Sequence, residues 1–277
     1  MHILRDKVTG TIKLHQRLYV TDVVKRFGME NANPVSTPME VSVNLFNDSE
    51  SEPLEPAVPY REAVGALMYA AVTTRLDIAN AVSKVARYVS APRRSHWIAV
   101  KRIIAYLKGT VEHGLTFARS GDGLILKGFC DADYAADIDT RRSTTGYVLL
   151  VNGTPVSWKS SLQSSVSLST CVAELFTITE AVKQIMWVRD ILHVLGYTQD
   201  QPTLLFNDNQ AALAVCANPV LNQRVKCVAV RVAFVREQVE EQVVVLKFVP
   251  SKENLADCLT KALATVSFRS AIVQLLI

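Results

Sequence analysis

The C-terminal part of the sequence predicts an α/β fold, a mixed sheet with flanking helices, preceded by a mostly helical region. From residue 115 onward, apolar runs of strand length alternate with segments of helical periodicity. Asn152-Gly153 separates two apolar runs, which is the strongest short signal for a β-hairpin. The chain has 277 residues, 49% hydrophobic and 20% charged, so a sizeable core can form and wholesale disorder is excluded.

The elements of this part are expected in the order β-β-β-α-β-α-α-β-α. The longest helix is predicted over 169–195, where apolar residues recur every three or four positions and Gly196 ends the helix. Strands are predicted at 124–131, 146–151, 154–159, 203–208 and 243–249. The other helices are predicted at 210–217, at 223–240 and from about Glu253 onward.

The first 114 residues are expected to be organised differently. Residues 1–30 predict a hairpin followed by a helix. Residues 31–59 predict a linker, because five prolines and a run of serines and acids disfavour a packed core. Three helices should follow, over 60–72, over 76–90, and from Ser95 as N-cap to 107. We therefore expect three regions, namely 1–59, a helical region 60–114 and an α/β domain 115–277.

Positive charge is concentrated in the second of these regions. The whole chain has a formal net charge of +4, whereas residues 75–108 hold eight basic residues and one acid, a net +7. Lysine and arginine bind phosphates without reading bases, so the excess favours contact with a nucleic acid backbone. An alternative is a solvated helix face, and the interleaved Trp97 and Tyr106 are interpreted as core residues. The residues expected to contact phosphate are Arg87, Arg93, Arg94, Lys101, Arg102 and Lys108.

Hydropathy and the counts of cysteine and histidine exclude several protein classes. No stretch approaches ~20 uninterrupted apolar residues, and charges interrupt the N-terminus, so we expect no transmembrane helix and no secretory signal. The sequence has five cysteines, an odd number, and no two of them have C-x-x-C spacing. This disfavours a disulfide framework or a zinc finger and fits a reducing, intracellular compartment. No histidine lies beyond His193, which excludes a histidine triad or metal site built within the C-terminal third.

Four acids stand at the edges of predicted elements in the α/β part. Asp131 and Asp208 end strands, Glu174 lies one turn into the long helix, and Asp257 lies early in the last helix. Carboxylates brought together repel unless cations neutralise them, and oxygen ligands suit Mg²⁺ or Mn²⁺. Two such ions can activate a water and stabilise a leaving 3′-oxygen in phosphodiester hydrolysis. The alternative is that each acid only caps a helix or forms a turn.

Longer strings of the sequence resemble one family. The ribonuclease H segment of copia-type LTR retrotransposon polyproteins resembles GFCDADYAADIDTRRSTTGYVLL (128–150), NDNQAALAVCANP (207–219) and ENLADCLTKAL (253–263). The segment 156–181 belongs to the same match. Residues 10–39 resemble the end of the family's reverse transcriptase, and residues 60–110 its thumb and connection.

The resemblance implies a ribonuclease H-like fold with a five-stranded mixed sheet. It also implies that Asp131, Glu174, Asp208 and Asp257 hold two divalent cations that hydrolyse the RNA strand of an RNA–DNA hybrid. The family's polymerase step needs two adjacent aspartates, and the sequence contains no Asp-Asp pair. We therefore expect a nuclease without polymerase activity of its own, with an RNA–DNA hybrid as its partner.

The sequence departs from the family pattern at several positions. At 226–234 the family usually reads K-H-I-D-x-R-Y-H-F, and two histidines and an aspartate of that pattern are absent here. Leu76 replaces a usual proline, Val172 a usual acid and Ala136 a common glycine. These losses keep open a second interpretation, a catalytically weak or inactive relic that only binds nucleic acid. A third interpretation is a polynucleotidyl transferase with the same fold, such as an integrase. It is disfavoured because it would need a different arrangement of acids and lacks the thumb-like segment that precedes the α/β part here. Oligomeric state stays open.

Overall fold

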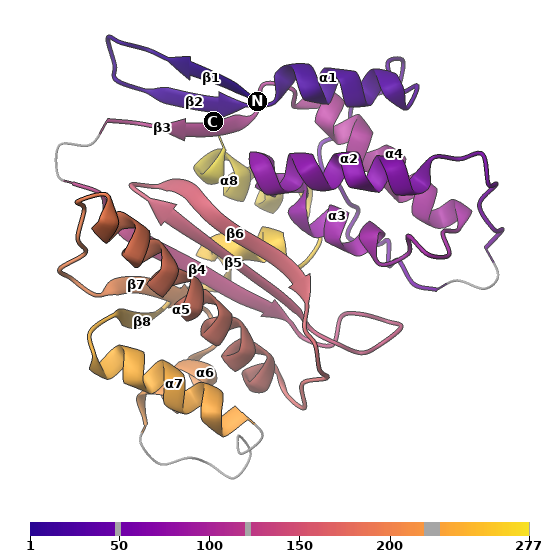
Figure 1. Ribbon diagram of the computed structural model, residues 1–277. Coiled ribbons are helices and arrows are strands. Elements are labelled where there is room, and N and C mark those ends of the chain that lie inside the picture. The colour runs from indigo at the N-terminus through magenta and orange to yellow at the C-terminus, as the bar shows by residue number, and fades with distance from the viewer. Residues whose placement is uncertain (48–50, 120–122, 219–227, 277) are drawn as a thin grey trace. The chain divides into compact units, whose positions relative to one another are not determined.

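The computed structural model describes residues 1–47, 51–119, 123–218 and 228–276 (Figure 1). By their contacts the residues form two compact units. The first unit comprises residues 1–119 together with 261–277, and the second unit comprises residues 120–260. Within the described residues, no helix combines the length and the hydropathy that a membrane span requires.

The second unit is built on a five-stranded sheet with the order β6-β5-β4-β7-β8. The first three strands pair antiparallel, while β7 and β8 run parallel to the central strand β4. This arrangement confirms the predicted mixed α/β sheet. The strands are β4 (Leu126–Asp133), β5 (Thr144–Val151), β6 (Thr154–Leu162), β7 (Thr203–Asn207) and β8 (Val244–Phe248).

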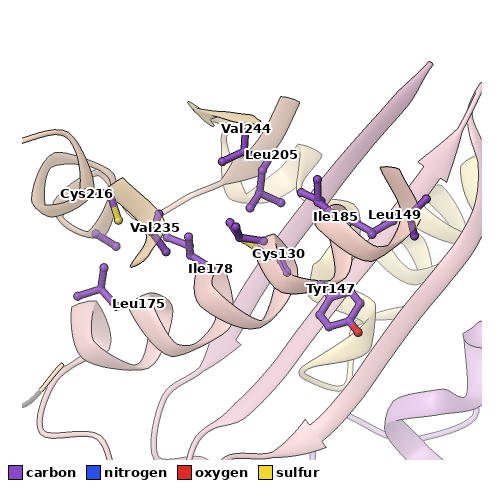
Figure 2. Packing of buried hydrophobic residues seen from close by; sticks show 14 of the residues in the cluster. Cys130, Tyr147, Leu149, Leu175, Ile178, Ile185, Leu205, Cys216, Val235 and Val244 are labelled. Carbon is purple, nitrogen blue, oxygen red and sulfur yellow. The ribbon is translucent and has the colours of Figure 1, made fainter. Parts of the chain in front are cut away.

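Three helices pack on this sheet: α5 (Thr170–Val194), α6 (Gln210–Ala217) and α7 (Ala229–Glu240). Their apolar side chains meet those of four strands in one core, which Figure 2 shows around Ile178, Leu205 and Val235. The predicted helices 169–195 and 210–217 are confirmed. Residues 223–227 of the predicted helix 223–240 lie outside the described residues, and the described part is helical from Ala229.

The hairpin between β5 and β6 forms at the predicted dipeptide. Asn152 and Gly153 both have positive φ, at 50° and 86°. A two-residue turn of this kind matches the right-handed twist of the strands that it joins, and asparagine and glycine enter it more readily than other residues. The turn therefore follows directly from the sequence.

The segment after β8 corrects one prediction. In place of a continuous helix from Glu253, the chain forms two short 3-10 turns, η3 (Ser251–Glu253) and η4 (Leu255–Leu259), before α8 (Thr265–Leu275). Asn254 separates the two turns with extended backbone angles, and its side chain accepts a hydrogen bond from the Ala256 N–H. An asparagine that caps a new turn in this way interrupts a helix that apolar periodicity alone would continue.

The first unit joins a small sheet to a set of helices. The strands β1 (His2–Arg5), β2 (Ile12–His15) and β3 (Gly114–Phe117) are antiparallel. The predicted hairpin and helix of residues 1–30 are confirmed, as are helices within 60–108. The helical elements are α1 (Arg17–Arg26), α2 (Tyr60–Thr73), η1 (Leu76–Ile78), α3 (Ala79–Ala86), α4 (Arg94–Gly109) and α8.

Two details of these helices differ from the prediction. The second helix is a 3-10 turn followed by α3, which ends four residues before Ser90. Ser95 is not the N-cap of α4, because the helix begins at Arg94. The ring of His96 supplies the cap, since its Nδ1 accepts the Arg93 N–H at 3.1 Å.

The boundaries of the units also differ from the expected regions. Residues 114–117 pair with β2, so the first unit continues to Arg119, and α8 belongs to it as well. Residues 31–59 are not a detached linker. Thr37 and Met39 are buried, and the backbone carbonyls of Leu45 and Phe46 accept hydrogen bonds from the side chains of Tyr88 and His96. Prolines prevented regular structure in this segment but not packing.

Candidate metal centre

Three of the four predicted acids come together in the second unit. Asp131 lies on β4, Asp208 directly follows β7, and Asp257 lies in η4. One carboxylate oxygen of each lies within 4.8 Å of the others. Strand register explains the first two positions, since Phe129 pairs with Phe206 in the parallel ladder and each aspartate follows two residues later. The two phenylalanine rings stack with their centroids 5.0 Å apart, which favours that register.

Glu174 lies outside this three-acid group, beside it on α5. Its side chain is buried, and the Asn207 Nδ2 donates a hydrogen bond to its Oε2 at 2.8 Å. Burial, and then the negative charge of Asp131, raise the pKa of the Glu174 carboxyl to about 8. The charge of Asp208 acts in the same direction. Glu174 therefore belongs to the same electrostatic environment as the three aspartates, and their charges make it harder for its own carboxyl to ionise.

Local capping residues hold the acid-bearing segments in place. The Ser169 side chain accepts the Val172 N–H and begins α5 shortly before Glu174. The Asn209 side chain accepts the Ala212 N–H at 2.9 Å, so the chain turns into α6 directly after Asp208. Each cap satisfies an N–H group that a helix start leaves unbonded.

Two hydroxyl groups from the C-terminal segment of the second unit bind the carboxylates. Ser251 Oγ donates to Asp208 Oδ2 at 2.6 Å, and Thr260 Oγ1 donates to Asp131 Oδ2. Hydrogen bonds of this kind fix the orientation of a carboxylate and leave its other lone pairs for a ligand. Sequence reasoning missed both residues, because hydroxyl side chains near chain turns are too common to single out.

A glycine opposite Asp131 makes this approach possible. Gly146 of β5 pairs with Asp131 in the antiparallel ladder. A Cβ atom at this position would lie 2.5 Å from Thr260 Cγ2 and 3.0 Å from Leu259 Cβ. Because glycine has no side chain, η4 and Thr260 can lie directly over the strand that pairs with Asp131.

The donor set of this centre fits a hard divalent cation. It consists of carboxylate oxygens alone, with Asp208 and Asp257 partly exposed to solvent and Asp131 buried. Mg²⁺ and Mn²⁺ prefer such ligands, and their charge would relieve the repulsion among the acids. Cys130 is no competing ligand, since its side chain lies in the core beside Leu205 and burial raises the pKa of its thiol (Figure 2).

Comparison with known proteins places the chain in a family. No family model matches the sequence. The chain is 40% identical over 273 residues to the retrovirus-related Pol polyprotein from transposon TNT 1-94 of Nicotiana tabacum, covering 97% of this chain and 20% of that protein. It is 36% identical over 264 residues to the Pol polyprotein from transposon RE2 of Arabidopsis thaliana, covering 95% of this chain and 18% of that one.

The chain belongs to the Pol polyproteins of copia-type retrotransposons. It spans about a fifth of the length of these relatives. Among solved structures, the copia-type chain matches LC11-RNase H1 with a TM-score of 0.39 and 15% identity, covering 53% of this chain and 98% of that one.

Four of the six predicted phosphate ligands of the copia-type chain have partners within its first unit. The Arg93 guanidinium donates to the Ser51 carbonyl, and Lys108 Nζ donates to the carbonyls of Glu30 and Ala32. Salt bridges join Arg94 to Glu52 and Arg102 to Glu40. These cations hold residues 30–52 against α4, a role that a count of charges does not reveal.

The remaining two predicted ligands and the two aromatic residues complete this region. Arg87 and Lys101 are half-buried, and among the residues that the structure describes the Lys101 side chain makes no hydrogen bond or ion pair. Tyr106 is buried, as expected for a core residue. Trp97 is half-buried, with its ring centroid 6.4 Å from that of Tyr60.

The altered family segment lies apart from the three-acid group. Lys226 and Cys227 lie outside the described residues, and the part from Val228 onward faces α5. The Arg231 guanidinium stacks 4.1 Å from the centre of the Phe176 ring and lies 3.6 Å from a carboxylate oxygen of Glu180. Together these elements line a cavity of about 480 Å³ between α5 and α7. None of the described residues of this segment belongs to the acid group.

Proposed function

We propose that this copia-type chain is a ribonuclease H, which hydrolyses the RNA strand of RNA–DNA hybrids and depends on a divalent metal. The observation that carries the proposal is the group formed by Asp131, Asp208 and Asp257 at one end of the central strand pair, with Glu174 beside it. Carboxylates that converge in this way from three separate segments favour a cation site over a set of independent caps.

The four acids would hold two Mg²⁺ or Mn²⁺ ions. When bound, such a pair supplies an activated water and stabilises the leaving 3′-oxygen. The chain's own hydroxyls contribute orientation, because Ser251 and Thr260 fix one oxygen of Asp208 and of Asp131. The partial exposure of Asp208 and Asp257 leaves the centre open to a phosphodiester. The sequence contains no Asp-Asp pair of the kind that the family's polymerase step needs, so the proposed function is hydrolysis and does not include nucleotide addition.

Hybrid cleavage by the purified chain tests this proposal. We expect cleavage of the RNA strand with Mg²⁺ or Mn²⁺, no cleavage of the DNA strand, and loss of activity with EDTA. The matched control is a duplex DNA of the same sequence. A chain that binds the hybrid but cleaves with neither ion would establish the relic interpretation.

Binding of the hybrid is tested separately from its cleavage. Lys101→Ala should weaken hybrid binding for all sequences and reduce the slope of log affinity against log salt by roughly 0.9, the value for one lost phosphate contact. Lys25→Ala, a change at an exposed lysine of α1, is the control and should leave the slope unchanged. Equal slopes for the parent and both variants would show that Lys101 faces away from the hybrid.

A further inference from the structure

Two buried asparagines converge on a single backbone oxygen beside the acid group. Asn207 Nδ2 lies 3.1 Å from the Cys130 carbonyl oxygen, and Asn254 Nδ2 lies 3.0 Å from the same atom. Asn207 ends β7, Asn254 caps η4, and Cys130 lies on β4. One oxygen atom thus connects the three segments that carry Asp208, Asp257 and Asp131.

We infer that Asn207 and Asn254 are positioning residues, which lock the acid-bearing segments to the Cys130 carbonyl and so preorganise the metal centre. This inference rests on the proposed function. It assigns to this pair the task of holding carboxylates together against their mutual repulsion.

The position of the Cys130 carbonyl explains why side chains bond it. The parallel ladder between β4 and β7 has its last registered pair at Phe129 and Phe206. Cys130 is the next residue of β4, and Asn207 the next of β7, so the Asn207 side-chain amide continues the connection beyond the last paired residues. A carbonyl oxygen has two lone pairs and can accept both amide donors.

Asn207 extends the same connection to the fourth acid. Its Nδ2 also donates to Glu174 Oε2 at 2.8 Å, and its Oδ1 accepts the Asn209 N–H at 3.0 Å. Asn254 Oδ1 likewise accepts the Ala256 N–H at 3.1 Å. Donor and acceptor of both amides are therefore used, and the two side chains are almost fully buried. Aspartate has no donor for the Cys130 oxygen, and serine does not reach as far.

The cleanest variant is Asn254→Ser. Serine keeps an oxygen that can cap η4, so the local turn is retained while the hydrogen bond to Cys130 is lost. Asn207→Ala removes the contacts to both Cys130 and Glu174. The matched control is Gln199→Ala, because Gln199 donates to the Leu124 carbonyl and accepts the Leu126 N–H at the opposite end of β4.

The main measurement is calorimetric titration of the 277-residue parent and its variants with Mn²⁺, together with urea unfolding of the metal-free proteins. We expect roughly tenfold weaker Mn²⁺ binding for Asn254→Ser and for Asn207→Ala, since groups that orient metal ligands contribute about 10–100-fold to affinity. Gln199→Ala should bind Mn²⁺ like the parent. The double variant should lose less than the product of the single losses, because both amides share one acceptor.

The outcomes separate this inference from the proposed function. Variants that stay folded and bind Mn²⁺ with parental affinity overturn the inference, even if the parent cleaves hybrids. A parent that binds Mn²⁺ but cleaves no hybrid overturns the function, while the shift in affinity still tests the two asparagines. Should Asn207→Ala fail to fold, Asn254→Ser decides alone. A parent that binds no Mn²⁺ at millimolar concentration overturns both.

Discussion

Each of the two units contains a cluster of buried or half-buried ionisable groups, and the two clusters differ in the charges that their members carry. In the first unit Arg75 and Asp77 are both fully buried, with Arg75 Nη2 2.7 Å from Asp77 Oδ2. Tyr106 donates to the same carboxylate at 2.7 Å. In the second unit three aspartates gather beside Glu174, so groups of the same charge lie together.

The directions of the pKa shifts follow from this difference. Burial by itself would raise the pKa of Asp77, but the charge of Arg75 and hydrogen bonds from His113, Arg75 and Tyr106 outweigh it, so that the pKa lies well below its usual range. Burial and like charges both raise the pKa of Glu174. A buried charge that an opposite charge compensates belongs to the fold. A group of like charges favours an external cation, which is typical of a functional site.

The largest effect is expected from breaking the compensated pair. Asp77→Ala leaves the Arg75 guanidinium buried without its carboxylate, and removing one partner of such a pair costs about 3–5 kcal/mol. We expect urea unfolding of the first unit to shift by that amount. The control is Glu52→Ala, which breaks the exposed pair with Arg94 and should cost at most about 1 kcal/mol. Equal losses for the two variants would contradict the distinction drawn between buried and exposed pairs.

Removing a charge from the like-charge group should act on chemistry and not on folding. Asp208→Asn should reduce hybrid cleavage at least about a hundredfold, because a neutral amide is a poorer ligand for a hard dication and each ~1.4 kcal/mol of barrier is tenfold in rate. Stability without metal should be kept or increased, since repulsion falls. Glu253→Gln is the control: it changes an exposed acid of η3 that is not in the group, and this variant should cleave like the parent. If the Asp208→Asn variant cleaved hybrids at the rate of the parent, the assignment of Asp208 as a metal ligand would be wrong.

The packing over Asp131 gives a smaller effect. Gly146→Ala places a Cβ atom 2.5 Å from Thr260 Cγ2, so Thr260 and η4 must move away from the strand. We expect about tenfold slower hybrid cleavage, because a displacement of ~1 Å in a site can cost up to about a hundredfold. Gly65→Ala on α2, where a Cβ atom meets nothing within 4 Å, is the control and should leave cleavage unchanged. Parental cleavage by Gly146→Ala would show that the centre tolerates this movement.

The last comparison concerns pH, on which the stabilities of the two units depend with opposite signs. The folded Glu174 binds its proton more tightly than the unfolded chain, so the metal-free protein should lose stability as pH rises from about 4.5 to about 8. Asp77 acts oppositely, and its contribution is lost as pH falls below its ordinary value of 3.8. Glu174→Gln should flatten the loss on the alkaline side. Urea unfolding at pH 5 and pH 8 measures this change in the free energy of unfolding. If Glu174→Gln lost as much stability between the two pH values as the parent, another group would be responsible.

Much of the fold of the second unit was predictable from local patterns. Strand-length apolar runs, the Asn152-Gly153 turn and the periodicity of α5 each reflect only a few neighbouring residues, and together they defined the sheet and its main helix. The sequence also placed Asp131 and Asp208 at strand ends, and the two lie close together because parallel strands end at the same edge of a sheet. The continuous helix from Glu253 was wrong, because periodicity does not detect a side-chain cap within an apolar run.

The sequence by itself determined which residue types were available: oxygen ligands in the C-terminal half, no histidine beyond His193 and a concentration of lysine and arginine between 75 and 108. Only the tertiary structure decided how they are used. It directed four of those cations to residues 30–52, gave Asp131 and Asp208 hydroxyl partners from Thr260 and Ser251, and brought two asparagines to the Cys130 carbonyl. The physical reason is distance along the chain. Asn254 and Cys130 are 124 residues apart, and a hydrogen bond between such residues exists only after the strands and turns that carry them have packed.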